Sequence, residues 1–351
     1  MNSSIDGDRE SLLQKLNTIY VPGYVNFFKN FPIHRNICYI ILGLIPYLGL
    51  LMLSRVMDVS LDFTTTWIFL TVSAIIIAAY SLLGNAYDKT CNSLNETIRL
   101  MNSRDQIIKF EDYIKLMFKS DYQIVTCMLL AIVGFSVVFL MDISLKYPFN
   151  LYLTFIAIFA FFSAGYGLWL AIASAYWISQ LKTLGPLTLN TVYPSNTLGI
   201  KKLSILLTTF SLSFSLELLL FLLIYFLAPW KNIELHNLFT QTLVFSFIIF
   251  MLFYFIYPQL GIKAIIVNYK EENLKDLENK IGETYKKDVL DVNDLNLIIG
   301  YNNLYKEINS SANFAIDFSV LFKFISSISV PLVFILKQNP KFILNIFDFI
   351  K

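Results

Sequence analysis

The chain has 351 residues, of which 56% are hydrophobic and 15% are charged, and its formal net charge is +2. This balance gives no reason to expect bulk binding to nucleic acid. Only two histidines are present, His34 and His236, which excludes most metal sites and histidine-based catalytic triads. No phosphate-binding loop or dinucleotide motif occurs. We therefore expect neither an enzyme nor a bound cofactor.

Six segments are apolar and long enough to cross a bilayer, because about 20 helical residues span a hydrocarbon core of ~30 Å. In chain order they are Asn36–Ser54, Trp67–Tyr87, Ile124–Met141, Leu151–Trp177, Leu203–Leu227 and Phe239–Ile262. Isolated strands are excluded, because lipid satisfies no backbone hydrogen bonds. The sequence predicts an all-α, polytopic helical membrane protein with six transmembrane helices and additional cytoplasmic helices.

The chain then divides into alternating membrane and cytoplasmic parts. We expect a cytoplasmic amphipathic helix in 1–35, a transmembrane hairpin in 36–87, a cytoplasmic helical hairpin in 88–123, four transmembrane helices in 124–262, cytoplasmic helices in 263–313 and a membrane-associated helix in 314–351.

Local signals place the ends of the non-membrane helices. Asp8 is expected to cap the first helix, whose apolar stripe consists of Leu12, Leu13, Leu16 and Ile19, and Pro22 and Gly23 are expected to end it. A break near Ser103 should divide the hairpin in 88–123.

The last span is expected to continue as a helix beyond the membrane. Acid-to-base pairs spaced i,i+4 would support it on its exposed side, namely Glu271–Lys275, Asp276–Lys280 and Glu283–Lys287. A turn near Asp291–Asn293 should precede a second helix around Asp294–Ile308, whose apolar residues require a partner surface.

The segment Phe314–Leu336 allows two interpretations, because Asp317, Lys323 and Pro331 interrupt its apolar run. A charge near the middle of a bilayer costs roughly 2.5–3.5 kcal/mol on insertion scales. We expect a helix packed on, or partly re-entering, the cytoplasmic face. The alternative is a seventh span.

The basic residues indicate the orientation of the chain. Of the 27 lysines and arginines, 20 fall on the side of the N-terminus and the long loops, and 3 fall on the other side. Positive charge is retained in the cytoplasm, so we expect a cytoplasmic N-terminus in the inner (plasma) membrane.

Span five carries two polar stripes on opposite faces. Ser204, Thr208, Ser211 and Ser215 form one, and Thr209, Ser213 and Glu217 form the other. Glu217 is the one acidic residue well inside the six spans. Ser204, Thr208, Ser211, Ser215 and Glu217 are candidates for lining a pore, with Glu217 attracting cations or binding protons. The alternative is interhelical hydrogen bonding.

Span four carries small residues on one face, at Ala160, Ala164, Gly167, Ala171 and Ser174. Such a seam permits close packing, either within the chain or between subunits.

Basic residues of the cytoplasmic segments are candidates for binding an anion. They are Arg99, Arg104, Lys109, Lys201 and Lys202. The ligand would be a nucleotide or oligonucleotide, although bases in such positions also contact lipid headgroups.

Two stretches suggest a family resemblance. They are YPQLGIKAIIVNYKEENLKDLENKIG at Tyr257–Gly282 and FAIDFSVLFKFISSISVPLVFIL at Phe314–Leu336, which together cover under a fifth of the chain. They resemble the post-membrane and C-terminal helices of prokaryotic multi-pass proteins. The overall plan is similar to membrane effectors of bacterial anti-phage defence, such as the Hailong channel partner. That resemblance implies control by a soluble nucleotidyltransferase through a nucleotide product.

The first functional hypothesis is an oligomeric ion channel or membrane-permeabilising effector, most simply a tetramer, gated through its cytoplasmic helices. A secondary transporter is a second hypothesis, although the inverted repeats typical of that class are not evident. A scaffold or sensor that binds a cytoplasmic regulatory protein is the third.

Overall fold

The computed structural model describes residues 2–18, 35–141, 145, 147–227, 233–286, 291–315 and 318–338. Within these ranges the chain contains helices and no strand. The α-helices are α1 (Asn2–Thr18), α3 (Arg35–Val56), α4 (Phe63–Arg99), α5 (Arg104–Met117), α6 (Ser120–Met141), α7 (Phe149–Gln180), α8 (Leu198–Leu227), α9 (Ile233–Tyr285), α10 (Val292–Ser310) and α11 (Phe318–Gln338). Two 3-10 helices, η1 (Leu181–Thr183) and η2 (Pro194–Asn196), connect α7 to α8.

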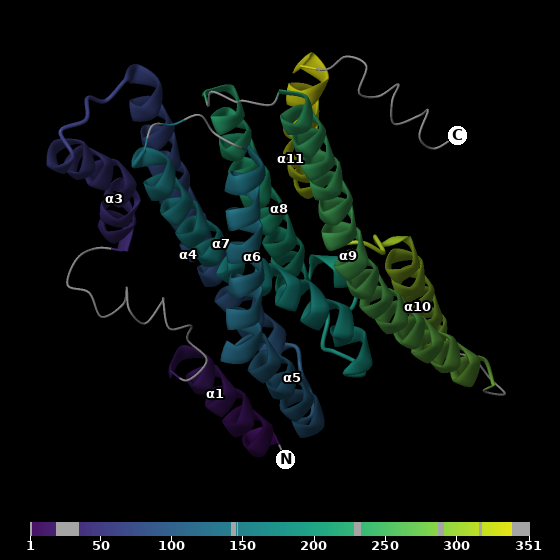
Figure 1. Cartoon of the computed structure of the whole chain (residues 1–351). Coiled ribbons are helices and arrows are strands. Elements are labelled where there is room, and N and C mark those ends of the chain that lie inside the picture. The colour runs from purple at the N-terminus through teal and green to yellow at the C-terminus, as the bar shows by residue number, and fades with distance from the viewer. Residues whose placement is uncertain are drawn as a thin grey trace.

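The described residues include six helical stretches long and apolar enough to cross a membrane, as the sequence predicts. They correspond to α3, α4, the α5–α6 region, α7, α8 and α9. Figure 1 shows the long helices side by side in an elongated bundle, with α1, α5 and α10 toward the end opposite the α3–α4 turn. The fold is therefore an all-helical bundle with accessory helices gathered at one end.

The largest cluster of buried apolar side chains lies toward the end that carries α1 and α5. Trp177 of α7 is 1% exposed and meets Phe110 of α5 edge-on, with ring centroids 5.5 Å apart. The indole nitrogen of Trp169 donates a hydrogen bond to the carbonyl of Met117. Aromatic packing and hydrogen bonding thus hold α5 against α7.

Helix α1 differs from its prediction at the N-terminus. It begins at Asn2, so Asp8 lies inside the helix and does not cap it; its carboxylate instead lies 3.3 Å from the Arg104 guanidinium. Leu12 and Leu16 are buried as expected, at 1% and 2% exposed. A cap residue cannot be told from an interior aspartate by local sequence when four helix-compatible residues precede it. Ile19, Pro22 and Gly23 lie outside the described residues.

The break between α4 and α5 lies where the sequence predicts it. Ser103 caps α5: its hydroxyl accepts a hydrogen bond from the Gln106 backbone, and the Gln106 side chain accepts one from the Ser103 backbone. This reciprocal arrangement satisfies donors that a helix start otherwise leaves unpaired. Gln106 also donates a hydrogen bond to the carbonyl of Pro186, 2.8 Å away, which ties the turn to the α7–α8 connection.

The small residues of span four pack within the chain. An added Cβ at Gly167 of α7 would lie 3.4 Å from Leu83 of α4. One turn away, the hydroxyls of Ser163 and Tyr80 are 2.9 Å apart and share a hydrogen bond between the same two helices. The seam therefore forms an α4–α7 contact inside one subunit.

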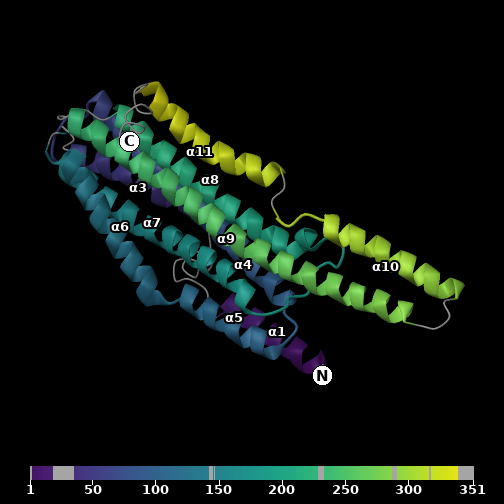
Figure 2. The ribbon, with the colours of Figure 1, turned by 90° about the vertical axis from the view of Figure 1, so that its right-hand side faces the viewer.

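Helix α9 is 53 residues long, or about 80 Å. It continues through Pro258 and projects from the bundle, where α10 folds back beside it (Figure 2). Asp291 caps α10 and accepts a hydrogen bond from the Asp294 backbone, so the second helix begins at Val292, close to its predicted start. We call this projection, formed by residues 270–286 and 291–310, the α9–α10 hairpin.

The hairpin is held by one apolar and one polar set of contacts. Ile298 and Ile308 of α10 are buried, as is Leu277 of α9. The Tyr305 hydroxyl donates a hydrogen bond to Glu278, 3.0 Å away, and this bond raises the pKa of Tyr305. Among the expected i,i+4 pairs, Asp276–Lys280 forms at 2.6 Å.

Neither Glu271 nor Lys275 forms an ion pair among the described residues, so that predicted pair is absent. The third pair includes Lys287, which lies outside the described residues. Exposed pairs of this kind contribute little, because the charges are screened and the side chains lose freedom.

Helix α11 packs lengthwise along α8 and α9 (Figures 1 and 2). Ser215 of α8 donates a hydrogen bond to the carbonyl of Ser327, and the rings of Phe255 and Phe324 stack with centroids 3.8 Å apart. Both expectations for this segment, a helix on or partly re-entering the cytoplasmic face and a seventh span, stay predictions. Its apolar stretch, Phe318–Ser329, is shorter than the six spans.

Candidate functional site

The first polar stripe of α8 is buried within the chain. Ser204, Thr208, Ser211 and Ser215 are 0–4% exposed. The Ser204 hydroxyl and the Gln259 amide of α9 are hydrogen-bonded at 3.2 Å, and Thr208 donates a hydrogen bond to the carbonyl of Ser204. With the Ser215–Ser327 bond, these contacts join α8 to α9 and α11. In this conformation the stripe holds helices together.

Two hydroxyls on the α8–α9 contact are not satisfied. The side-chain oxygens of Ser211 and Tyr254 are buried and have no hydrogen-bond partner among the described residues. Leaving such a group unpaired costs about 1–3 kcal/mol. These two hydroxyls therefore reduce the stability that the α8–α9 contact contributes.

Glu217 belongs to the opposite stripe of α8. It follows Thr209 and Ser213 at four-residue intervals, on the side of α8 that faces α4. Its side chain is partly exposed, and it forms no hydrogen bond or ion pair with another described residue. A carboxylate with no protein partner on an apolar helix remains available to water, a proton or a cation. Since the two stripes face opposite ways, they do not line one path.

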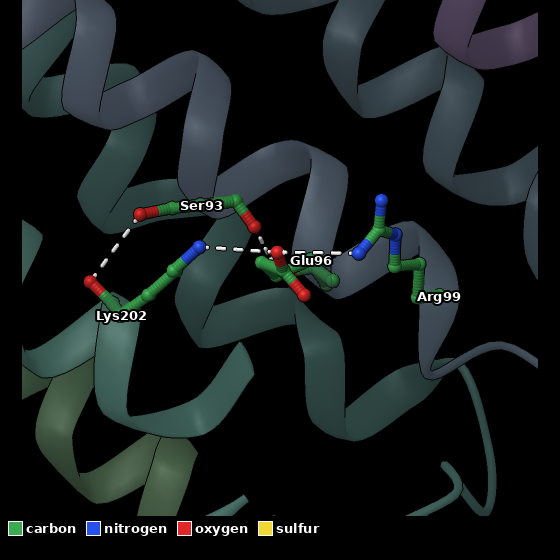
Figure 3. Close-up of polar contacts among 5 residues, drawn as sticks. Ser93, Glu96, Arg99 and Lys202 are labelled. Atoms are coloured by element: carbon green, nitrogen blue, oxygen red, sulfur yellow. Dashed lines mark hydrogen bonds and ion pairs between the residues drawn. The ribbon is translucent and has the colours of Figure 1, made fainter. Parts of the chain in front are cut away.

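The structure brings two of the five basic candidates together around a carboxylate. Lys202 Nζ lies 3.0 Å from Glu96 Oε1, and Arg99 Nη1 lies 3.5 Å from the same oxygen (Figure 3). Ser93 donates a hydrogen bond to the carbonyl of Lys202, which anchors the start of α8 to α4. Gly199 allows this approach, because a Cβ there would lie 2.8 Å from Leu100.

The other three basic candidates are distributed around this cluster. Lys201 is exposed beside Lys202, Lys109 is exposed on α5, and Arg104 pairs with Asp8 of α1. An anion at the cluster would compete with Glu96, because that carboxylate already partly neutralises both cations. Glu96 was missed by the sequence analysis, although its i,i+3 spacing to Arg99 was a signal for it.

A second lysine site was also missed. Lys270 of α9 is 6% exposed, and its ammonium donates hydrogen bonds to the carbonyls of Asn309 and Ser311 and to Oδ1 of Asn313, at 3.2, 2.8 and 2.8 Å. A cation at the carboxyl end of α10 interacts favourably with the helix dipole. The lysine thereby ties the end of α10 to α9 at the base of the hairpin.

No group of three histidine, cysteine, aspartate or glutamate side chains in the described ranges is placed to hold a metal ion. The described cysteines, Cys38, Cys91 and Cys127, are not in disulfides. Comparison of the chain with family models, curated proteins and solved structures gave no match. The functional interpretation therefore depends on the residues of this chain.

Proposed function

We propose that this protein is an oligomeric ion channel, or membrane-permeabilising effector, of the inner membrane, gated through the α9–α10 hairpin. The six apolar helices would cross the bilayer, with the hairpin in the cytoplasm as the 20:3 charge distribution indicates. Anti-phage defence is the biological role that the resemblance implies.

The observation that carries this proposal is the connection of the hairpin to α8 from both sides. The hairpin begins as the continuation of α9 and leads directly into α11. Both helices pack on α8, through Gln259 and Ser204 on one side and Ser327 and Ser215 on the other. A ligand or partner that displaces the hairpin would therefore move α9 and α11, two of the helices that pack on the helix that carries Glu217.

Glu217 would act as the charged group of the conduction path. In a closed ring of subunits each copy contributes one carboxylate, and such a ring concentrates cations. A tetramer is the simplest assembly that we propose. The buried Ser/Thr stripe would keep α8 attached to α9 and α11, leaving Glu217 to face the path.

Planar-bilayer recordings of the full chain test this proposal. Glu217→Gln keeps the size and hydrogen-bonding capacity of the side chain and removes its charge, so cation preference or conductance should fall. Glu10→Gln, at an exposed position on α1, is the matched control and should conduct as the parent does. Unchanged selectivity in Glu217→Gln would overturn the role of Glu217, and absence of current in every preparation would overturn the channel.

A second candidate function rests on the surface of α10. Val292, Leu295 and Ile299 are 73%, 48% and 57% exposed on the projecting hairpin. Apolar side chains in such a position suit a scaffold or sensor that binds a cytoplasmic protein. Leu295→Ser with Ile299→Ser would then abolish partner binding, whereas a hairpin that only gates a pore would retain binding and alter current.

A further inference from the structure

Helices α4 and α11 both pack on α8, and a strip of α8 between them is exposed. The strip carries Ile205, Leu212 and Leu216, which are 46%, 39% and 41% exposed. The exposed strip is therefore apolar.

Two lysines flank this strip, one on α4 and one on α11. Lys89 of α4 reaches across to α8, where its ammonium donates a hydrogen bond of 2.9 Å to the Thr209 hydroxyl. Lys323 is exposed on α11, one turn before Ser327, whose carbonyl accepts a hydrogen bond from Ser215 of α8. The charge of Lys323 also acts on Lys89. Neither lysine forms an ion pair with another described residue.

The hydrogen-bonding capacity of the two ammonium groups is largely unused. Each ammonium has three N–H donors, and among the described residues one of the six has an acceptor, the Thr209 hydroxyl for Lys89. Thr209 itself donates to the carbonyl of Ile205, so its hydroxyl is oriented as an acceptor for Lys89. An anion between the two lysines would offset their repulsion and accept hydrogen bonds from several of the remaining donors.

The position of the two lysines along the bundle indicates which class of anion would bind between them. Lys89 lies seven residues before Glu96 on α4, so it is about 10 Å along the helix from the Glu96–Lys202 ion pair. The ion pair marks the polar end of the bundle, and Leu212 and Leu216 of the strip lie on the other side of Thr209. Headgroup phosphates occupy this boundary in a bilayer.

We propose that the exposed strip between α4 and α11 binds an anionic phospholipid, with its phosphate between Lys89 and Lys323 and its acyl chains along Leu212 and Leu216. The proposal rests on the membrane placement in the proposed function and does not require conduction. A bound lipid would bridge α4 to α11, the helix that follows the hairpin. Membrane composition would in that way affect the position of α11 against α8.

Native mass spectrometry of the full chain in mild detergent tests the proposal, with phosphatidylglycerol and phosphatidylcholine of identical acyl chains as probes. Phosphatidylglycerol should be retained preferentially. Each lysine-to-glutamine change should weaken retention about fivefold, and Lys89→Gln with Lys323→Gln roughly 25-fold, since a base near the membrane surface contributes about 1 kcal/mol. Lys275→Gln, which removes an exposed lysine of α9, is the control and should have no effect.

Equal retention of both lipids, or full retention in the double glutamine variant, would overturn the proposal. A further arm adds inorganic phosphate at millimolar concentration: displacement of the lipid would assign the site to free phosphate instead. Lys89→Arg with Lys323→Arg should keep retention, which separates lost charge from misfolding. Bilayer recordings of the same samples test conduction separately from lipid binding. A protein that retains lipid without conducting would refute the channel proposal and leave the lipid proposal standing.

Discussion

Replacing Lys270 by methionine should loosen the base of the α9–α10 hairpin. The change keeps an unbranched side chain of similar length and removes three hydrogen bonds from a charged donor. Bonds to charged groups contribute roughly 1.5–3 kcal/mol each, but part is recovered because a buried ammonium no longer has to be desolvated. We expect a net loss of about 3 kcal/mol in the stability of this contact.

Hydrogen exchange measured by mass spectrometry on peptides covering 306–315 is the appropriate assay, because it reports local opening. A loss of about 3 kcal/mol corresponds to exchange faster by on the order of 100-fold. Lys275→Met, one turn further along α9 on an exposed position, should change exchange little. Equal protection in the two variants would refute the interpretation of Lys270 as the tie between α9 and the end of α10.

Three further outcomes are expected. Single cysteines introduced at Lys115 and Lys280, in a background without other cysteines, should be protected from impermeant reagents in intact cells, and labelling of either from outside would reverse the orientation. Mass measurement in mild detergent should show a closed homo-oligomer, and a monomer at high concentration would remove the channel proposal. Gly261→Ala should lower the thermal midpoint, because the added Cβ would lie 2.9 Å from Cα of Ser179 on α7. Gly282→Ala, with nothing within 4 Å, should instead raise it slightly, and the reverse order would contradict the packing of α7 on α9.

Local chemistry was sufficient to predict the helices and several of their ends. Each apolar run is long enough by itself to require a helix in lipid, and the six stretches recur in the fold. Ser103 with Gln106, and Asp291 with Asp294, form caps whose atoms all lie within four residues. Both partners of such an interaction lie close together in the sequence, so the sequence alone is enough to predict it.

The roles of individual polar residues were decided by tertiary contacts instead. The sequence predicts that Asp8 is a helix cap, but in the structure it pairs with Arg104, which is 96 residues away. In the sequence Lys270 is one of several basic residues of the predicted cytoplasmic segment. In the structure its ammonium donates hydrogen bonds to carbonyls about 40 residues further along the chain. The partners of a polar side chain on a regular helix are determined by which other helix lies against that face, and packing of helices on one another sets this neighbour. For the same reason the position of α11 depends on residues far away in the sequence: Ser327 and Phe324 meet Ser215 of α8 and Phe255 of α9, while Lys323 remains exposed.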